Sequence, residues 1–502
     1  MKEEIKKGTK AHRHEGTKEN LTCFHPSFLP SVPPCLRAFV PWLFFGILLS
    51  GNCFAQYYGG GGAGEHAFSL ERWDEDYSYL KDAKAGGDFL DPIKYMPLNK
   101  QGDVYLSLGG QARYRYDYFN NPTFGPGTND EDGFHLQRYL LHADLHAGQY
   151  VRAFVQADSA WVDGREGGPR PGDTDHLDLQ QGFVDLKTSD AANPFGFLRL
   201  GRQELVYGAQ RLVSPDDWRN VRRSFDGAKL SLSIPNDTVE AFWVRPVLIE
   251  QDQFNNDVKG TSFAGIYNVL ALPALMRDGN LKLDTYLFAL NQSRRSPAGI
   301  DADTYTAGMR FHGNPKPFDF DVEGDYQFGQ RGGQGGANIS AWSVAAEAGY
   351  TLPTTMTPRA FAGLDIASGS PDVGKRFNQL FPPTYMYLGH VYLFGRTNLI
   401  DTHAGVELHL THNLTFSAAE HVFWRENTDD AMYNLSGAVV RADNGTDAAY
   451  VGNELDFSLN WQIGEHLTGY IGWAHFFTGD FIQNTGASED VDFLYVSATF
   501  TF

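Results

Sequence analysis

The sequence predicts an all-β fold, a transmembrane antiparallel up-and-down β-barrel of about eighteen strands with lipid outside and a polar lumen inside. Three observations predict it. Between Tyr105 and the last residue, segments of about 10–15 residues alternate apolar and polar side chains. The connections between these segments alternate between short and long. The last segment, "FLYVSATFTF", is amphipathic and ends on Phe502. We expect the barrel to span residues 104–502.

The N-terminal residues predict export from the cytoplasm. In "RAFVPWLFFGILLSGNCFAQ", Arg37 precedes an apolar run, and the small residues Cys53 and Ala55 stand just before a cleavage point at Gln56. Residues 1–55 are therefore expected to be a signal peptide, and residues 56–103 a periplasmic N-terminal segment with a Gly-rich linker. All three cysteines fall in the signal peptide, which excludes disulfides and thiol chemistry from the mature chain.

The first predicted strand, "YLSLGGQARYRYDYF", alternates charged side chains with leucines and tyrosines. Alternate side chains of a strand point to opposite faces, so Arg113, Arg115 and Asp117 share one face and leucines and tyrosines the other. A soluble sheet with one wet face and a barrel strand with a polar lumen both fit this strand. The same alternation recurs in residues 132–147, 317–330, 399–411 and 451–462.

The lengths of the connections favour the barrel. Short turns are predicted near Gly148-Gln149, Pro235-Asn236, 313–315, Pro353–Thr357, His412 and Gly464. Long loops are predicted near 120–133, 163–176, 205–223, 249–260, 369–398, 427–449 and 478–489. Outer-membrane barrels have short periplasmic turns and long outer loops, so we expect a location in the bacterial outer membrane with both termini in the periplasm.

The charge balance limits the function classes. The chain has 61 acidic against 41 basic residues and a formal net charge of −20, which argues against general nucleic-acid binding. A protein this acidic can handle an anion only where its positive charges are concentrated locally.

Arginines are densest in "LRLGRQELVYGAQRLVSPDDWRNVRRSFDGAKL", residues 198–230. Within it, Arg202, Arg211, Arg219, Arg222 and Arg223 accompany a connection long enough to fold into the pore as a constriction. Such a loop would favour anions, because a guanidinium stays charged and binds carboxylates through two parallel hydrogen bonds. The alternative is a surface loop whose arginines pair with its own aspartates.

The first strands carry a second set of candidate residues. Arg113, Arg115, Arg138 and Arg152 fall on the predicted inner face, and Asp117, Asp144, Asp158 and Asp185 alternate with them. We interpret these arginines as a basic ladder along the lumen, in which the interleaved aspartates, Asp144 and Asp185 among them, prevent a polyanion from binding too tightly to leave. The alternative is a lumen lining of mutual salt bridges.

Three residues of one predicted strand raise the alternative of a metal-dependent enzyme. His403, Glu407 and His409 share a strand face and could suit a metal, but a lumenal position explains them without one. The sequence has no G-x-S-x-G nucleophile motif, and its acid-rich stretches at 74–82 and 125–132 lack EF-hand spacing. We therefore predict no enzymatic activity, no cofactor and no metal.

Four segments resemble the alginate export family of outer-membrane proteins: "DGFHLQRYLLHADLHAG", residues 198–230, "KRFNQLFPPTYMYLGH" and the terminal strand. The similarity covers about Arg72 to Phe502. It implies a monomeric eighteen-stranded barrel with an arginine-lined constriction, through which a periplasmic secretion complex passes a polyuronate outward. It also implies that conduit residues include Arg113, Arg115, Arg138, Arg152, Arg202, Arg219, Arg222 and Arg223.

The sequence and the resemblance together predict an outer-membrane channel that exports an anionic, alginate-like polysaccharide. Its expected partners are the polymer, outer-membrane lipid and periplasmic secretion components. The alternative within the same architecture is a diffusion porin for small anions or oligosaccharides. The alternative from another class is an outer-membrane enzyme.

Overall fold

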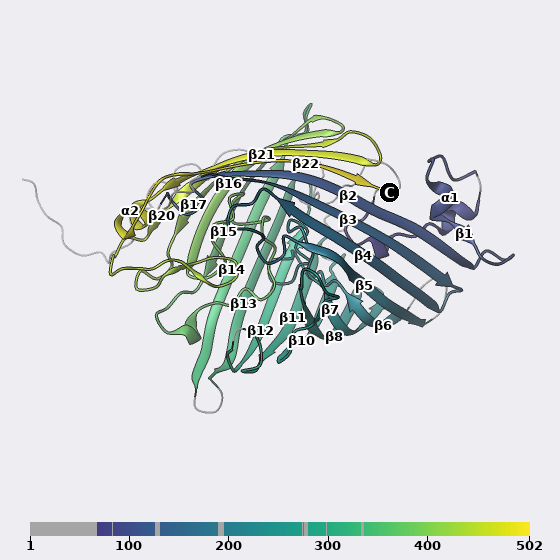
Figure 1. The fold of residues 1–502 in the computed structure, drawn as a ribbon, viewed down its shortest axis with the longest axis horizontal. Coiled ribbons are helices and arrows are strands. Elements are labelled where there is room, and N and C mark those ends of the chain that lie inside the picture. Colours follow the sequence, from purple (N-terminus) through teal and green to yellow (C-terminus); the bar gives the residue numbers. More distant parts are fainter. Residues whose placement is uncertain are drawn as a thin grey trace, which may run out of the picture. The chain divides into compact units, whose positions relative to one another are not determined.

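The computed structural model describes residues 68–82, 84–125, 131–188, 195–273, 275, 280–297, 299–332 and 336–502. The wall is a closed barrel of eighteen antiparallel strands, each paired with its neighbours along the chain. Its first strand, β2 (Val104–Asn120), pairs with its last, β22 (Val491–Thr501), and this pairing closes the barrel (Figure 1). The predicted fold class is confirmed. The predicted signal peptide lies outside the described residues.

The other wall strands follow in chain order around the barrel. They are β3 (Glu131–Ala147), β4 (Val151–Asp163), β5 (Asp175–Thr188), β6 (Gly196–Gln203), β7 (Phe225–Ile234), β8 (Asp237–Leu248), β10 (Thr261–Ala271), β11 (Lys282–Gln292), β12 (Ala302–Gly313), β13 (Phe318–Arg331), β14 (Ala337–Thr351), β15 (Arg359–Ala367), β16 (Leu399–Thr411), β17 (Leu414–Trp424), β20 (Tyr450–Gln462) and β21 (Leu467–Thr478).

The remaining elements are short. They are η2 (Arg72–Asp74), η3 (Ser78–Lys81), α1 (Asp91–Lys94), η4 (Val373–Lys375), α2 (Asp480–Thr485), β1 (Met96–Pro97), β9 (Asn256–Asp257), β18 (Met432–Tyr433) and β19 (Val439–Arg441). Among the described residues, no helix is long and apolar enough to cross a membrane.

Apolar side chains cover the outside of the barrel, and charged side chains lie inside it. Leu141 is 60% exposed and Val155 is 51% exposed, although both stand in the middle of strands. Arg138 and Asp117, on the opposite face, are 1% and 0% exposed. A soluble sheet would show the reverse arrangement, so this distribution is the one expected of a barrel surrounded by lipid.

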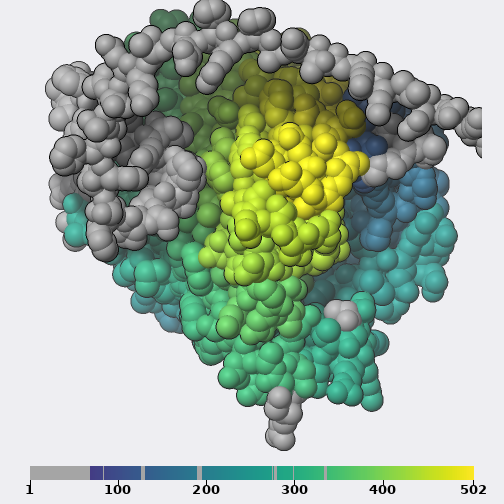
Figure 2. Space-filling model, turned by 90° about the vertical axis from the view of Figure 1, so that its left-hand side faces the viewer, coloured from purple at the N-terminus to yellow at the C-terminus, as the bar shows by residue number. Residues whose placement is uncertain are grey.

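The connections define two ends of the barrel. Short turns follow β3, β7, β12, β14, β16 and β20, at what we call the turn end, and long loops follow β2, β4, β6, β8, β15, β17 and β21, at the loop end. All of these were predicted; the connections after β5, β10, β11 and β13 were not. Figure 2 shows the loop end, where segments from the last third of the chain, coloured lime to yellow, form the nearest surface.

Two of the long loops fold into the barrel. We call residues 204–224 the first inner loop and residues 368–398 the second inner loop. Both carry apolar side chains that are almost fully buried against the wall. Leu205 and Val213 of the first inner loop pack with Phe263 on β10, and Phe394 of the second packs with Phe423 on β17. The lumen therefore contains two apolar cores that fix the loops in place.

The described N-terminal segment, residues 68–97, packs at the turn end. Arg72 donates hydrogen bonds to the carbonyl oxygens of Gly110 and Phe502, at 3.0 and 2.8 Å, and so contacts both sides of the closing seam. Ser107 on β2 donates to the carbonyl oxygen of Lys94 in α1 at 2.5 Å.

The assignment of the apolar outer face to lipid can be tested at β4. Arginine at the bilayer midplane costs a barrel about 2–4 kcal/mol, and about 0–1 kcal/mol near the interface. We expect Val155→Arg, in the middle of the strand, to lower the free energy of unfolding from lipid vesicles by about 2–4 kcal/mol.

The matched control is Val151→Arg, the same substitution on the same outward face at the first residue of β4, where 38% of the side chain is exposed. We expect about 0–1 kcal/mol there, measured by urea titration. Equal losses at the two positions would contradict the assignment of this face to lipid.

Candidate functional site

Three arginines of the wall hold the first inner loop across the lumen. Arg113 on β2 donates to the carbonyl oxygen of Asp217 at 2.6 Å. Arg138 on β3 donates to the Asp217 carboxylate at 2.7 Å. Arg115 donates to the carbonyl oxygen of Trp218 at 2.5 Å, and its guanidinium carbon lies 3.9 Å from the centre of that ring. These arginines point into the lumen as predicted, and each donates hydrogen bonds to the loop. Arg115 also donates two hydrogen bonds to Asp117 on its own strand, at 2.8 and 2.9 Å.

The Asp217 carboxylate lies among several of the arginines that hold the first inner loop to the wall, and we call this group of contacts the anchor. Burial alone would raise the pKa of Asp217, but Arg138, Arg222 and Arg113 outweigh burial and hold the pKa well below its usual range. Such a carboxylate stabilises the fold at all pH values above its ordinary pKa, and the contribution is lost only as the pH falls through the lowered value. The anchor is therefore charged throughout the neutral and mildly acidic range.

Arg222 lies deeper, between three carboxylates. It donates to Glu204 at 2.6 Å and to Glu71 of the N-terminal segment at 3.2 Å, and it lies 3.4 Å from Asp217. Burial alone would lower the pKa of Arg222, but these carboxylates raise it above its ordinary value. Arg222 therefore ties the first inner loop to the N-terminal segment.

The second inner loop packs directly on the first. The Trp218 and Tyr385 rings stack with their centres 3.9 Å apart. The Thr384 hydroxyl donates to the Asp216 carboxylate at 2.7 Å, and the Phe381 amide donates to the carbonyl oxygen of Leu212 at 2.9 Å. The two inner loops together form a partition inside the barrel.

A cavity of about 900 Å³ lies on the loop-end side of this partition. Its wall residues stand at the loop ends of their strands, as Thr261 begins β10 and Arg331 ends β13. Among the described residues that line it, the charged side chains are one carboxylate, Asp216, and five arginines, Arg170, Arg219, Arg223, Arg331 and Arg376. We call it the loop-end cavity.

The five arginines differ in how strongly they are already paired. Arg376 lies 2.8 Å from Asp430, outside the cavity lining. Arg219 donates to the carbonyl oxygen of Pro171 at 2.8 Å. Burial lowers the pKa of Arg223 to about 10, so Arg223 is still charged at neutral pH. Arg331 lines the cavity, and its guanidinium has no hydrogen bond or ion pair among the described residues. The cavity therefore keeps guanidinium groups that an incoming anion can bind.

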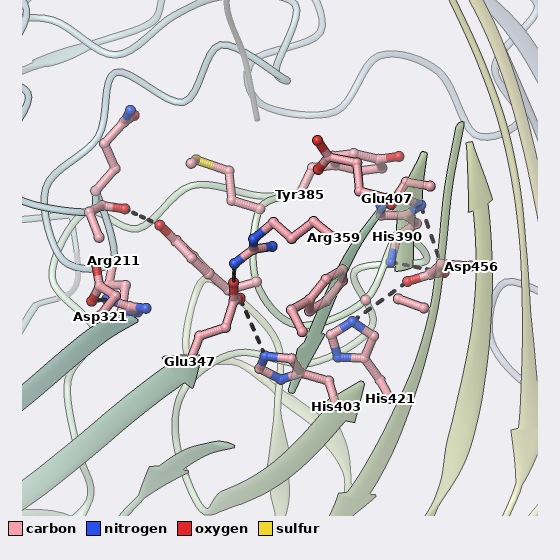
Figure 3. Close-up of a pocket in the computed structure, with 18 of the residues that line it drawn as sticks. Arg211, Asp321, Glu347, Arg359, Tyr385, His390, His403, Glu407, His421 and Asp456 are labelled. Carbon is pink, nitrogen blue, oxygen red and sulfur yellow. Dashed lines mark hydrogen bonds and ion pairs between the residues drawn. The ribbon is translucent and has the colours of Figure 1, made fainter. Parts of the chain in front are cut away.

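A second cavity, of about 300 Å³, lies on the turn-end side and shares no lining residue with the first among the residues described. Its wall includes Arg359, the first residue of β15, and its charges are mixed (Figure 3). Arg359 lies 2.6 Å from Glu347, and Arg211 of the first inner loop lies 2.8 Å from Asp321. We call it the turn-end cavity.

The remaining predicted conduit residues are paired with carboxylates of the wall. Arg152 donates to Asp144 at 2.7 Å through Nε, and Arg202 donates to Asp226 at 2.8 Å. Asp185 accepts two hydrogen bonds from Arg199, at 2.7 and 2.9 Å. These pairs match the salt-bridged lining that the sequence left open as an alternative.

The predicted set is thus divided among several places. Arg219 and Arg223 line the loop-end cavity, and Arg211 lines the turn-end cavity. A third, smaller cavity of about 110 Å³ lies beside the first inner loop and is lined by Arg113, Arg115, Arg138 and Arg222. The sequence patterns did not indicate five other arginines that line the two cavities: Arg170, Arg331, Arg376, Arg310 and Arg359. Only Arg376 stood in a segment that already carried the family resemblance.

The histidines considered as metal ligands do not gather as one set. His409 contacts Thr415 at 3.0 Å, whereas His403 contacts Asp401 at 3.0 Å. Asp401 also contacts His421 on the neighbouring strand at 3.0 Å. In Figure 3 the His403 and His421 rings lie side by side, with their centres 5.0 Å apart.

Comparisons with known proteins agree with this architecture. A family model described as alginate export matches residues 104–495. Solved structures of Pseudomonas aeruginosa proteins share the fold: OpdQ has a TM-score of 0.53 at 14% identity and covers 79% of this chain and 98% of its own. OpdK, called an outer membrane protein, has a TM-score of 0.52 at 12% identity with the same coverage. OpdK with vanillate has a TM-score of 0.51 at 11% identity, again with that coverage. No match was found among curated proteins.

The stacked Trp218 provides a test of the partition. We expect Trp218→Ala to raise single-channel conductance and to add current fluctuations, because the ring that joins Arg115 to Tyr385 is lost. Removing a buried tryptophan also costs about 3–5 kcal/mol of stability.

The control is Trp243→Ala, at a tryptophan that is 52% exposed on the lipid face of β8. We expect its conductance in planar bilayers to equal that of the wild type. If Trp218→Ala left conductance and current noise unchanged, the partition would not limit ion flow.

Proposed function

Since the chain belongs to the alginate export family of outer-membrane β-barrel proteins, we propose that it is a channel for export of an anionic, alginate-like polysaccharide. In this proposal the polymer arrives from periplasmic secretion components at the turn end, and a single barrel passes it outward. The outward direction of transport is supported by membership of a family described as alginate export.

The observation that supports a polyanion most strongly is the charge of the loop-end cavity. Five arginines and one carboxylate line it among the described residues, although the whole chain carries a net charge of −20. A polyuronate has one carboxylate on each sugar, and a guanidinium binds a carboxylate through two parallel hydrogen bonds. The positive cavity would attract each carboxylate and partly replace its hydration.

The turn-end cavity supports movement of the polymer. Arg211, Arg310 and Arg359 there are all paired with acidic residues of the wall. A carboxylate of the polymer must compete with the acidic residues of the wall for each of these arginines. Each contact is therefore weaker than one to a free guanidinium, and the polymer can leave it again. Many weak sites therefore suit a polymer driven by synthesis upstream.

A diffusion porin for small anions is the second candidate. It is favoured by the shared fold with OpdK, whose structure contains vanillate, and by the two separate cavities on either side of the partition. The two candidates differ in how binding depends on chain length. A polymer channel should bind longer uronate oligomers more tightly, because successive carboxylates meet successive arginines.

The test is block of single-channel current by uronate oligomers. We expect the double variant Arg219→Gln plus Arg376→Gln to raise the half-blocking concentration at least about tenfold, which corresponds to about 1.4 kcal/mol for two lost charge-assisted contacts.

The matched control is Arg245→Gln, at an arginine that lines neither cavity and pairs with Asp257 at 2.9 Å. We expect no change in block there. Equal block by the wild type and the double variant would overturn the role of the loop-end cavity. Block that did not strengthen with oligomer length would favour the small-anion porin.

A further inference from the structure

Three aspartates converge in the wall near the loop end. Asp158 stands on β4, and Asp175 and Asp178 are the first and fourth residues of β5. They are 2%, 0% and 3% exposed. Each offers a carboxylate oxygen, and these oxygens all lie within 4.8 Å of one another. None of these aspartates lines the two cavities assigned to the polymer.

The pairing of the strands brings like charges together. Asp158 on β4 is the direct cross-strand partner of Asp178 on β5, and the register shifts on both sides of Asp158. Two like charges directly opposite one another in a sheet are destabilising. Burial strengthens the repulsion, because water is excluded from between the groups.

The neighbouring residues neutralise only part of this charge. Arg202 reaches Asp178 at 3.1 Å, but it also pairs with Asp226 at 2.8 Å. The Asn255 side-chain amide donates to Asp175 at 2.6 Å and to Asp178 at 2.9 Å. One shared arginine and one neutral amide therefore face three carboxylates.

Asp158 is the group that points to a missing ligand. Both of its carboxylate oxygens are buried and have no hydrogen-bond partner among the described residues, and the same holds for Oδ1 of Asp175. Burying a carboxylate without a partner is strongly unfavourable, so buried charges are normally paired or coordinate a metal. Elsewhere in this lumen, Asp144 and Asp185 each accept two hydrogen bonds from an arginine.

We propose that Asp158, Asp175 and Asp178 bind a divalent cation, calcium, in the barrel wall. Calcium takes oxygen ligands at about 2.3–2.6 Å, so oxygens that share one ion lie within about 5 Å of one another, as these do. The group contains no histidine or cysteine, which argues against zinc. Magnesium usually keeps several bound waters, which a buried site favours less.

The site would join three parts of the loop end. β4 contributes Asp158, and β5 contributes the other two aspartates. The loop after β8 is held there because the Asn255 backbone amide donates to Asp178 at 2.9 Å. Arg170 and Pro171 of the loop-end cavity lie only a few residues before Asp175. Calcium would therefore fix the wall next to that cavity, whatever passes through the channel.

The experiment uses the full mature chain refolded in a non-ionic detergent, free of lipopolysaccharide and treated with a chelator. Isothermal titration with calcium chloride should show one saturable site in the wild type. Asp158→Asn and Asp175→Asn should each weaken binding at least about 10–100-fold, since loss of a ligand costs no less than loss of a supporting residue. The control Asp257→Asn, at a carboxylate already paired with Lys259, should bind like the wild type.

Thermal unfolding gives an independent measurement. Calcium should raise the unfolding temperature of the wild type and leave Asp158→Asn unchanged. Without calcium, Asp158→Asn should unfold at a higher temperature than the wild type, because it removes a buried like charge. A wild type that binds no calcium, an Asp158→Asn variant that binds it equally well, or a calcium-free Asp158→Asn that unfolds at a lower temperature would each overturn the proposal.

Discussion

The contact between the wall arginines and the backbone at Asp217 and Trp218 determines what the lumen can do. Lipid outside the barrel forces the charged side chains of the strands inward, where each needs a partner. Arg113 and Arg138 find theirs in the first inner loop, and Arg115 binds both that loop and Asp117 on its own strand. Because Trp218 then stacks on Tyr385, the same contact positions the second inner loop, and the two inner loops separate the loop-end cavity from the turn-end cavity.

Ion pairs between lumenal arginines and wall carboxylates explain how an acidic protein can present a positive surface to an anion. Most lumenal arginines lie against carboxylates of the wall, so their charges cancel locally. The charge that is not cancelled collects in the loop-end cavity, around Arg219 and Arg331, whereas Arg223 lies 3.9 Å from Asp216. Total charge is therefore a poor guide to the selectivity of this lumen, since a permeating ion responds to the few groups close to its path.

Sequence alone predicted the barrel and the facing of its side chains, because a period of two assigns Arg113 and Asp144 to the lumen without further information. It also predicted that the arginine-rich connection could fold inward. It could not predict the partners, because they are distant in the chain: Arg222 meets Glu71, which lies 151 residues away. The connections after β5, β10, β11 and β13 were not predicted, because the periodicity gave no clear boundary there.

The loop-end cavity was also beyond sequence reasoning, because Arg170, Arg331 and Arg376 come from the loop after β4, the end of β13 and the second inner loop. The cross-strand pairing of Asp158 with Asp178 depends on a register shift that the alternation does not encode. Each of these features follows from strand register and loop packing, which only the folded chain defines.

The central claim is that local arginines, rather than the net charge of −20, determine which ions the lumen favours. The most direct measurement is the reversal potential of the wild-type channel in a potassium chloride gradient across a planar bilayer. We expect a reversal potential whose sign corresponds to preferential permeation of chloride. Preferential potassium permeation would contradict it.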